Sequence, residues 1–149
     1  RTPPRAYYHS CPCLSMVALT PEMQELFKAT KHFAFATASK DGEPNVVPIG
    51  MAIMMDPETI WIGDQFFKRT LANVKENPRV ALLVWTSGAP GCLKLKGDVT
   101  LVQKGPDYER MYRMVKERKP NLECKGLLIM KVTEVYDCRS GPDAGKRLL

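Results

Sequence analysis

The sequence predicts a mainly β protein of the α+β class, in which six antiparallel strands form a small, closed or nearly closed barrel with short flanking helices. Several segments alternate apolar and polar residues with the period of two that is typical of a strand, and hairpins or single short helices join them. The strand–helix–strand rhythm of a parallel sheet is absent. With 149 residues, 44% of them hydrophobic, the chain is long enough to form one domain around a real core.

Composition divides the chain into three parts. Residues 1–17 are rich in proline and show no periodic apolar pattern, so they are expected to form an irregular N-terminal extension. Residues 18–138 carry the periodic segments and form the barrel. Residues 139–149 contain glycine and proline and are expected to form a C-terminal tail.

The first elements are a helix and a β-hairpin. Thr20, followed by a proline, is a typical helix N-cap, and apolar side chains then recur on one helical face. The period changes to two over residues 32–38, which predicts the first strand. Asp41 and Gly42 form a strong hairpin signal, and the second strand is expected over residues 45–55.

This second strand is apolar on both faces, unlike a strand with one face in water. Pro48 lacks a backbone donor and Gly50 lacks a side chain, a combination typical of a bulge or a sheet edge where a ligand or another backbone comes close. Two interpretations remain open. A ligand or partner chain covers the second face, or the strand lies between the barrel core and a helix.

The remaining elements follow the same patterns. A short third strand over residues 60–62 leads into a helix that ends at Pro78, and another helix begins at Pro106 and ends before Pro120. Further strands are expected over residues 80–86, 93–101 and 126–136.

The stretch 63–79 is the main candidate for a binding site. It reads as a strand end, a basic loop and a helix that opens near Lys68, Arg69 and Thr70. The first amide groups of a helix lack partners and the helix dipole is positive there, so two cations and a hydroxyl at this point suit a phosphate. The alternative is that Lys68 and Arg69 belong to an ordinary solvated loop.

Net charge favours a small anionic partner. Lysine and arginine number 22 against 16 acidic residues, which gives +6. These charges are spread over all the elements and are not interleaved with aromatics, so nucleic acid is not the expected partner. No apolar run reaches the roughly 20 residues of a membrane span and no signal peptide appears, so a cytoplasmic protein outside the membrane is expected.

The five cysteines do not indicate a disulfide framework, because their number is odd and most are scattered; reduced thiols are expected. Cys11 and Cys13 form the only close pair. Since His9 and His32 are the only histidines, no metal site is predicted. Neither a Ser-His-Asp nor a Cys-His arrangement appears, and no catalytic side chain is predicted.

The ordered set of motifs resembles a known family. A strand and an Asp-Gly hairpin are followed by Asn-Val-Val-Pro-Ile-Gly, Ile-Trp-Ile-Gly, a basic helix start, Asn-Pro-Arg-Val and Leu-Lys-Leu-Lys-Gly. This order, over about residues 21–136, resembles the pyridoxamine 5′-phosphate oxidase-like family of FMN-binding split barrels, and in particular its short FMN-binding proteins. The resemblance implies a six-stranded antiparallel split β-barrel with FMN as cofactor.

The resemblance also implies roles for particular positions. The FMN phosphate is held at the helix start by Lys68, Arg69 and Thr70. The edge of the isoalloxazine ring meets the backbone of Val47, Pro48, Ile49 and Gly50. The ribityl chain passes Gly63 and Asp64. The electron-rich side of the ring is approached by Lys94 or Lys96.

The function implied is that of an FMN-binding flavoprotein, with an FMN-dependent oxidoreductase of unidentified small-molecule substrate as the leading hypothesis. An FMN-binding electron-transfer protein without a dedicated substrate is the first alternative, and a nucleic-acid-binding barrel is a third. A homodimer with the flavin between protomers is implied as well. The tail 139–149 holds no histidine, so activity on pyridoxamine phosphate itself is not expected. Deazaflavin and haem remain open as alternatives to FMN.

Overall fold

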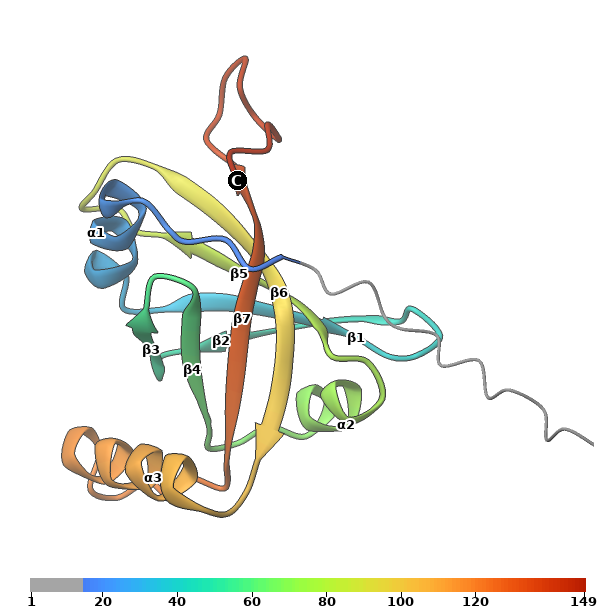
Figure 1. Ribbon diagram of the computed structural model, residues 1–149, viewed down its shortest axis with the longest axis vertical. Coiled ribbons are helices and arrows are strands. Elements are labelled where there is room, and N and C mark those ends of the chain that lie inside the picture. The colour runs from blue at the N-terminus through green and yellow to red at the C-terminus, as the bar shows by residue number, and fades with distance from the viewer. Residues whose placement is uncertain (1–14) are drawn as a thin grey trace, which may run out of the picture.

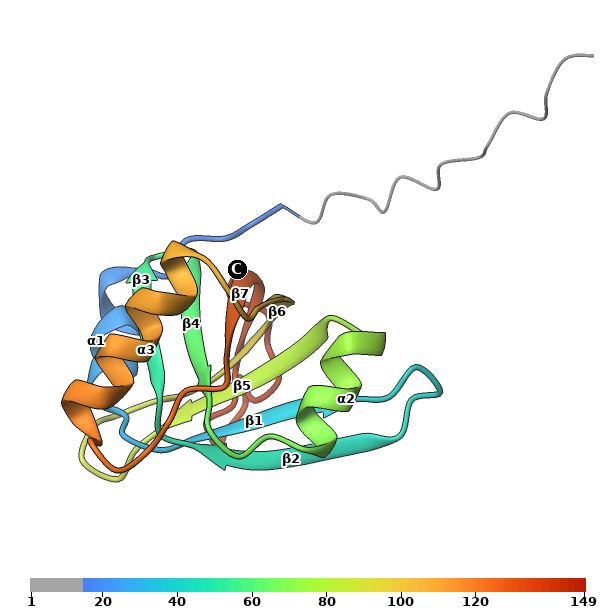
Figure 2. The same cartoon turned by 90° about the horizontal axis from the view of Figure 1, so that it is seen from below.

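The structure is a computed structural model that describes residues 15–149. Seven strands form one antiparallel sheet in the order β2-β1-β5-β6-β7-β4-β3, which curls into a split barrel (Figures 1 and 2). The strands are β1 Phe33–Ala38, β2 Pro44–Ile49, β3 Ala52–Asp56, β4 Thr59–Asp64, β5 Arg79–Trp85, β6 Cys92–Val102 and β7 Gly126–Asp137. The helices are α1 Pro21–Ala29, α2 Arg69–Glu76 and α3 Pro106–Arg118.

The expected second strand over residues 45–55 is in fact two strands, so the prediction of six strands is wrong. The chain leaves β2 at Ile49, turns through Gly50 and Met51, and continues as β3. β2 pairs with β1, whereas β3 pairs with β4 at the opposite edge of the sheet. The sequence hides this corner because the residues before and after it are equally hydrophobic.

Local signals correctly predicted the first helix and the hairpin. The Thr20 hydroxyl accepts a hydrogen bond from the backbone N–H of Met23 at 3.3 Å and so caps α1. Gly42 has a φ of +87°, a conformation that glycine adopts without strain, and its N–H donates to the Ser39 carbonyl at 3.0 Å. The β1–β2 hairpin therefore forms where Asp41 and Gly42 predicted it.

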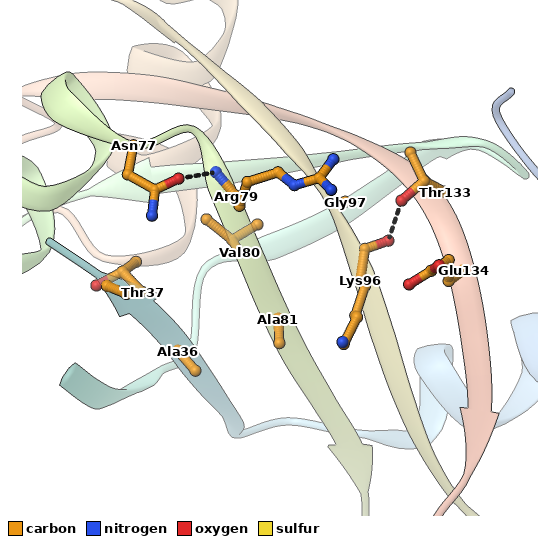
Figure 3. Close-up of a pocket in the computed structure, with 11 residues that line it drawn as sticks. Ala36, Thr37, Asn77, Arg79, Val80, Ala81, Lys96, Gly97, Thr133 and Glu134 are labelled. Atoms are coloured by element: carbon orange, nitrogen blue, oxygen red, sulfur yellow. Dashed lines mark hydrogen bonds between the residues drawn. The ribbon is translucent and has the colours of Figure 1, made fainter. Parts of the chain in front are cut away.

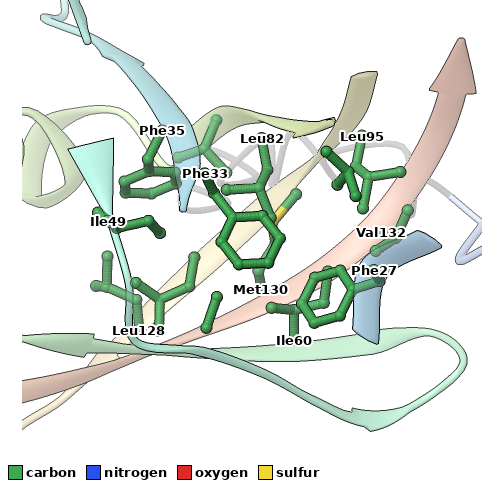
Figure 4. Packing of buried hydrophobic residues seen from close by; sticks show 14 of the residues in the cluster. Phe27, Phe33, Phe35, Ile49, Ile60, Leu82, Leu95, Leu128, Met130 and Val132 are labelled. Atoms are coloured by element: carbon green, nitrogen blue, oxygen red, sulfur yellow. The ribbon is translucent and has the colours of Figure 1, made fainter. Parts of the chain in front are cut away.

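Two apolar clusters hold the fold together. The first fills the barrel with side chains from neighbouring strands, among them the fully buried Phe35, Leu82, Leu95 and Met130 (Figure 4). The second joins α3 to the opposite face of β3 and β4, and Met111 is its fully buried centre. Because β4 has a cluster on each face, all six of its residues are buried.

The second cluster decides between the two interpretations of the apolar run. Ile53 and Met55 of β3 pack against α3, so a helix covers that half of the run. In the other half, Val46 of β2 points away from the barrel and stays 65% exposed. The helix interpretation therefore holds for β3, and the outer face of β2 is left open.

The C-terminal segment folds back on the end of β7. Leu148 N–H donates to the Val135 carbonyl at 2.7 Å, and Gly145 N–H donates to the Asp137 carbonyl at 2.7 Å. The Arg139 guanidinium lies 2.7 Å from the Asp137 carboxylate, and this hydrogen-bonded ion pair lowers the pKa of Asp137. The predicted tail is thus anchored to the barrel near both its start and its end.

The predictions about Cys11, Cys13 and His9, and most of the predicted extension 1–17, lie outside the described residues. None of the helices in residues 15–149 is long and apolar enough to cross a membrane.

Candidate functional site

A cavity of about 450 Å³ opens where β2 turns into β3, beside the N-terminal end of α2. It has the size of a small-molecule site. Its lining contains three cations and no acidic side chain, beside apolar residues from β2 and from the segment before α2. The lining residues are Val47, Pro48, Ile49, Gly50, Met51, Gly63, Gln65, Phe66, Phe67, Lys68, Arg69, Thr70, Lys119 and Leu122.

The start of α2 offers unpaired donors to this cavity. Lys68 is the N-cap residue, but no side chain caps the helix, and no acidic residue lies in the first turn. The first amide N–H groups of α2 therefore lack the protein partner that Thr20 supplies to α1. Lys68 and Arg69 are exposed at the same point, so the helix dipole and two cations act together on an anion.

Thr70 stands out because its side chain is only 1% exposed although it lies beside the cavity. Its hydroxyl oxygen accepts a hydrogen bond from the Asn45 amide at 3.1 Å. The same Asn45 amide reaches the hydroxyl of Thr37 at 3.3 Å, and the Asn73 amide also donates to Thr37 at 3.0 Å. This network fixes Thr70 Oγ1 as an acceptor and leaves its proton free to donate to a ligand.

Asp64 shapes the loop before α2 from behind the cavity. It is fully buried, and its Oδ1 accepts a hydrogen bond from the Phe67 N–H at 2.9 Å. Burial raises the pKa of Asp64, against the lowering effects of the Phe67 hydrogen bond and of Lys125. Asp64 was expected to lie along the ribityl chain of FMN. In the structure it supports the loop and does not line the cavity.

Gln65 and Lys119 belong to the cavity but were not predicted from the sequence. The amide nitrogen of Gln65 is buried without a hydrogen-bond partner, so it can donate to a ligand. Lys119 follows α3, and its Nζ lies 3.6 Å from the position that a Cβ would take at Gly50. A Cβ at position 50 would therefore meet this cation at ordinary contact distance. No local pattern connects Lys119 with α2, since they meet only in the folded chain.

The structure brings together eight of the eleven predicted site residues; Asp64 lies outside the lining, and the two lysines of β6 lie on another face. Val47, Pro48, Ile49, Gly50, Gly63, Lys68, Arg69 and Thr70 all line the cavity. Lys94 and Lys96 instead lie on the outer face of β6, where their Nζ atoms sit 4.9 and 5.5 Å from the centre of the Tyr136 ring.

A second cavity, of about 310 Å³, lies beside Lys96 (Figure 3). Its lining comes from β1, β5, β6 and β7 and includes Ala36, Ala81, Arg79 and Glu134. Ala36 and Ala81 lie opposite each other in the register of β1 with β5, and Ala81 lies opposite Lys96 in that of β5 with β6. A flat row of small residues therefore leads across the outer face to Lys96.

Fold and site together define a split-barrel protein in which a basic helix start lies beside a partly apolar cavity. The chain belongs to the pyridoxamine 5′-phosphate oxidase family, whose model matches residues 19–139. The recognition of this family from the order of its motifs is confirmed.

Comparison with known proteins finds one relative by sequence and several by structure. The chain is 38% identical to the uncharacterized protein MJ0282 of Methanocaldococcus jannaschii over 135 residues, 89% of each chain. Among solved structures, HupZ of Group A Streptococcus has a TM-score of 0.74 and 21% identity, covering 85% of this chain and 99% of its own. An FMN-binding protein of Syntrophomonas wolfei has a TM-score of 0.66 and 18% identity, and the match covers 78% of this chain and 88% of its own.

The names of two further solved structures refer to other ligands. HutZ, the haem storage protein of Vibrio cholerae, has a TM-score of 0.63 and 17% identity, covering 81% of this chain and 95% of its own. An F420 reductase has a TM-score of 0.60 and 20% identity, and the match covers 75% of this chain and 94% of the reductase chain. At these identities the likeness establishes the shared fold.

Proposed function

We propose that this protein binds FMN in the cavity at α2 and is an FMN-dependent oxidoreductase acting on a small molecule. The observation that carries the proposal is the lining of the cavity. Lys68, Arg69 and Lys119 are its charged side chains, and no carboxylate opposes them, so a phosphate is favoured over a cation. Family membership and the likeness to an FMN-binding protein support the same ligand.

The residues present fit FMN at both of its ends. The phosphate would lie at the start of α2, held by free amide groups, Arg69, Lys68 and the free proton of Thr70. The ring would lie against the backbone from Val47 to Gly50, where Pro48 has no amide hydrogen and Gly50 has no side chain. Bound FMN supplies the redox chemistry, and the chain binds, orients and shields it.

We further propose a homodimer in which the flavin lies between protomers. Val46, Ala36 and Ala81 form one row across the outer face of β2, β1 and β5, and Lys96 ends this row on β6. This face is apolar and built of small residues, so a second copy of the sheet can approach it closely. Lys94 and Lys96 do not line the cavity at α2 of their own chain, so they would reach only a flavin bound to the partner.

An electron carrier without a dedicated substrate is the alternative within the same chemistry. Both proteins would bind FMN, and they differ in turnover. An oxidoreductase exchanges electrons between its flavin and a small-molecule substrate, which reduces the flavin if it is a donor and reoxidises it if it is an acceptor, whereas a carrier passes electrons to another protein.

Titration of the purified full chain with four ligands tests the proposal. FMN, riboflavin, F420 and haem are added separately, and binding is followed by ligand absorbance and by quenching of flavin fluorescence. We expect the tightest binding for FMN and weaker binding for riboflavin, which lacks the phosphate. Tighter binding of haem or F420, or no binding of FMN, would overturn the assignment. Reduction by NAD(P)H with candidate acceptors then separates enzyme from carrier.

A further inference from the structure

Two cysteines lie opposite each other at the end of the β6–β7 ladder. Leu93 pairs with Asp137 in this ladder, so the next pair is Cys92 and Cys138. The backbone N–H of Cys138 donates to the Cys92 carbonyl at 2.8 Å, which makes them a hydrogen-bonded antiparallel pair. The register of β5 with β6 places Trp85 opposite Cys92 on its other side.

This arrangement places the two cysteines at a backbone separation that suits a disulfide. Directly opposite residues of an antiparallel pair project from the same face, and the Cα atoms of a hydrogen-bonded pair lie about 5.5 Å apart. That separation is within the range of about 4.4 to 6.8 Å that a disulfide spans. The Cβ atoms of a hydrogen-bonded pair lie about 5.5 Å apart and must approach to about 3.5 to 4.5 Å, so the bond requires a small shift where the ladder ends.

Both thiols are also accessible to a small reagent. Cys92 and Cys138 are free and partly exposed, and they line one cavity of about 410 Å³ together with Trp85 and Arg139. Cys124, by contrast, is buried, and its thiol donates to the Gly126 carbonyl at 3.1 Å. Among the described residues, Cys92 and Cys138 are therefore the reactive pair.

We propose that Cys92 and Cys138 form a reversible intramolecular disulfide. The thiolate of one cysteine attacks a sulfur of a small-molecule disulfide such as oxidised glutathione and releases one glutathione thiolate. The second cysteine then attacks the protein sulfur of this mixed disulfide and releases the other glutathione. Two protein thiols are oxidised, one glutathione disulfide is reduced to two thiols, and the two protons pass to the released thiolates.

The bond would fix the start of the C-terminal segment to β6. Cys138 directly follows Asp137, where the chain turns back toward Leu148. Because Cys92 and Cys138 are far apart in sequence, the disulfide also restricts the unfolded chain over a long loop. Oxidation should therefore stabilise the barrel and its C-terminal end together.

Burial raises the pKa of Cys92, and the nearby charges of Cys138 and Asp137 raise it further. Less of the Cys92 thiolate is present at neutral pH, so exchange through Cys92 is slow there. The test is accordingly run at mildly alkaline pH, where more of the thiolate is present than at neutral pH.

The full chain carrying Cys11→Ser and Cys13→Ser is equilibrated with mixtures of oxidised and reduced glutathione, digested without reduction and examined by mass spectrometry. We expect one cross-linked peptide pair, joining Cys92 to Cys138, and no glutathione adduct. Excess reduced glutathione should reverse the link. The parent chain is treated in parallel, and it should give the same pair.

Two physical readouts accompany the mapping. Trp85 lies beside the pair, so the disulfide should quench its fluorescence, while the buried Trp61 on β4 should be unaffected. Tm should rise by about 5 to 10 °C on oxidation. Cys124→Ser should behave like the parent, whereas Cys92→Ser should take up one glutathione at Cys138 and show no such rise.

Failure to find the Cys92–Cys138 peptide in folded, oxidised protein would overturn the proposal. A link that forms only between chains, or that uses Cys124, would do the same. A linked chain with an unchanged Tm would remove the stabilising role assigned to the bond.

Discussion

Replacing Thr70 by valine isolates the hydroxyl that we assign to the FMN phosphate. Valine has nearly the same shape, so the wall of the cavity is kept while the donor is removed. Thr70 is only 1% exposed, so a water molecule cannot readily supply the hydrogen bond that the lost hydroxyl would donate. A hydrogen bond to a charged group contributes about 1.5 to 3 kcal/mol, and FMN should therefore bind roughly ten- to hundredfold more weakly.

The same substitution has a separate cost in the folded protein. Asn45 loses the acceptor that it now has at 3.1 Å, but it keeps Thr37 at 3.3 Å. The loss should be about 1 kcal/mol, which corresponds to a fall in Tm of roughly 2 to 4 °C. Thermal unfolding without ligand measures this cost, so that it is not mistaken for lost binding.

Thr70→Ser is the matched control, because it keeps the hydroxyl and loses only a methyl group. Fluorescence titration should show near-parental FMN affinity for the serine variant and weak affinity for the valine variant. Riboflavin affinity should change little in either, since riboflavin has no phosphate. Equal FMN affinity of the valine and serine variants would refute the placement of the phosphate at Thr70.

Three further outcomes are expected. Arg69→Ala should weaken FMN binding about tenfold, which is near the lower limit for a charged hydrogen bond because Arg69 is exposed. Its affinity for riboflavin should not change. The control variant Lys104→Ala, which lies away from the cavity, should bind both ligands like the parent. Ala36→Glu places a charge on the outer face and should prevent the proposed dimer from forming, so that light scattering gives the mass of a folded monomer; a parent and a variant that are both dimers would show that the partner binds elsewhere. Asp64 has a raised pKa, so the folded chain keeps a proton that the unfolded chain loses above about pH 4, and stability falls as the pH rises. Asp64→Asn removes that titration, so its Tm relative to the parent should increase between pH 4 and pH 7; a constant difference would contradict the shift.

Local patterns in the sequence were sufficient for most of the elements. Thr20 caps α1 and Gly42 turns the hairpin because these signals depend only on near neighbours in the chain. The basic start of α2 could be predicted for the same reason, since helix ends leave donors unpaired wherever they occur. Lys68, Arg69 and Thr70 were therefore correctly expected to lie together at one helix terminus.

Other features depend on which strands become neighbours, and the sequence does not encode that in any single segment. The apolar run 45–55 shows no sign of the corner at Gly50, because the residues on both sides are equally hydrophobic and each half pairs with its neighbour in the chain. Only the sheet order places β2 and β3 at opposite edges. Lys119 reaches the cavity only because α3 packs over β3 and β4. Alternation placed Lys94 and Lys96 on one face of their strand, but only the sheet order decided that this face is turned away from the cavity at α2. Helix capping, turn conformation and side-chain period are local properties of the chain. Burial of the common core decides which distant segments meet, and this is why tertiary structure alone completed the site.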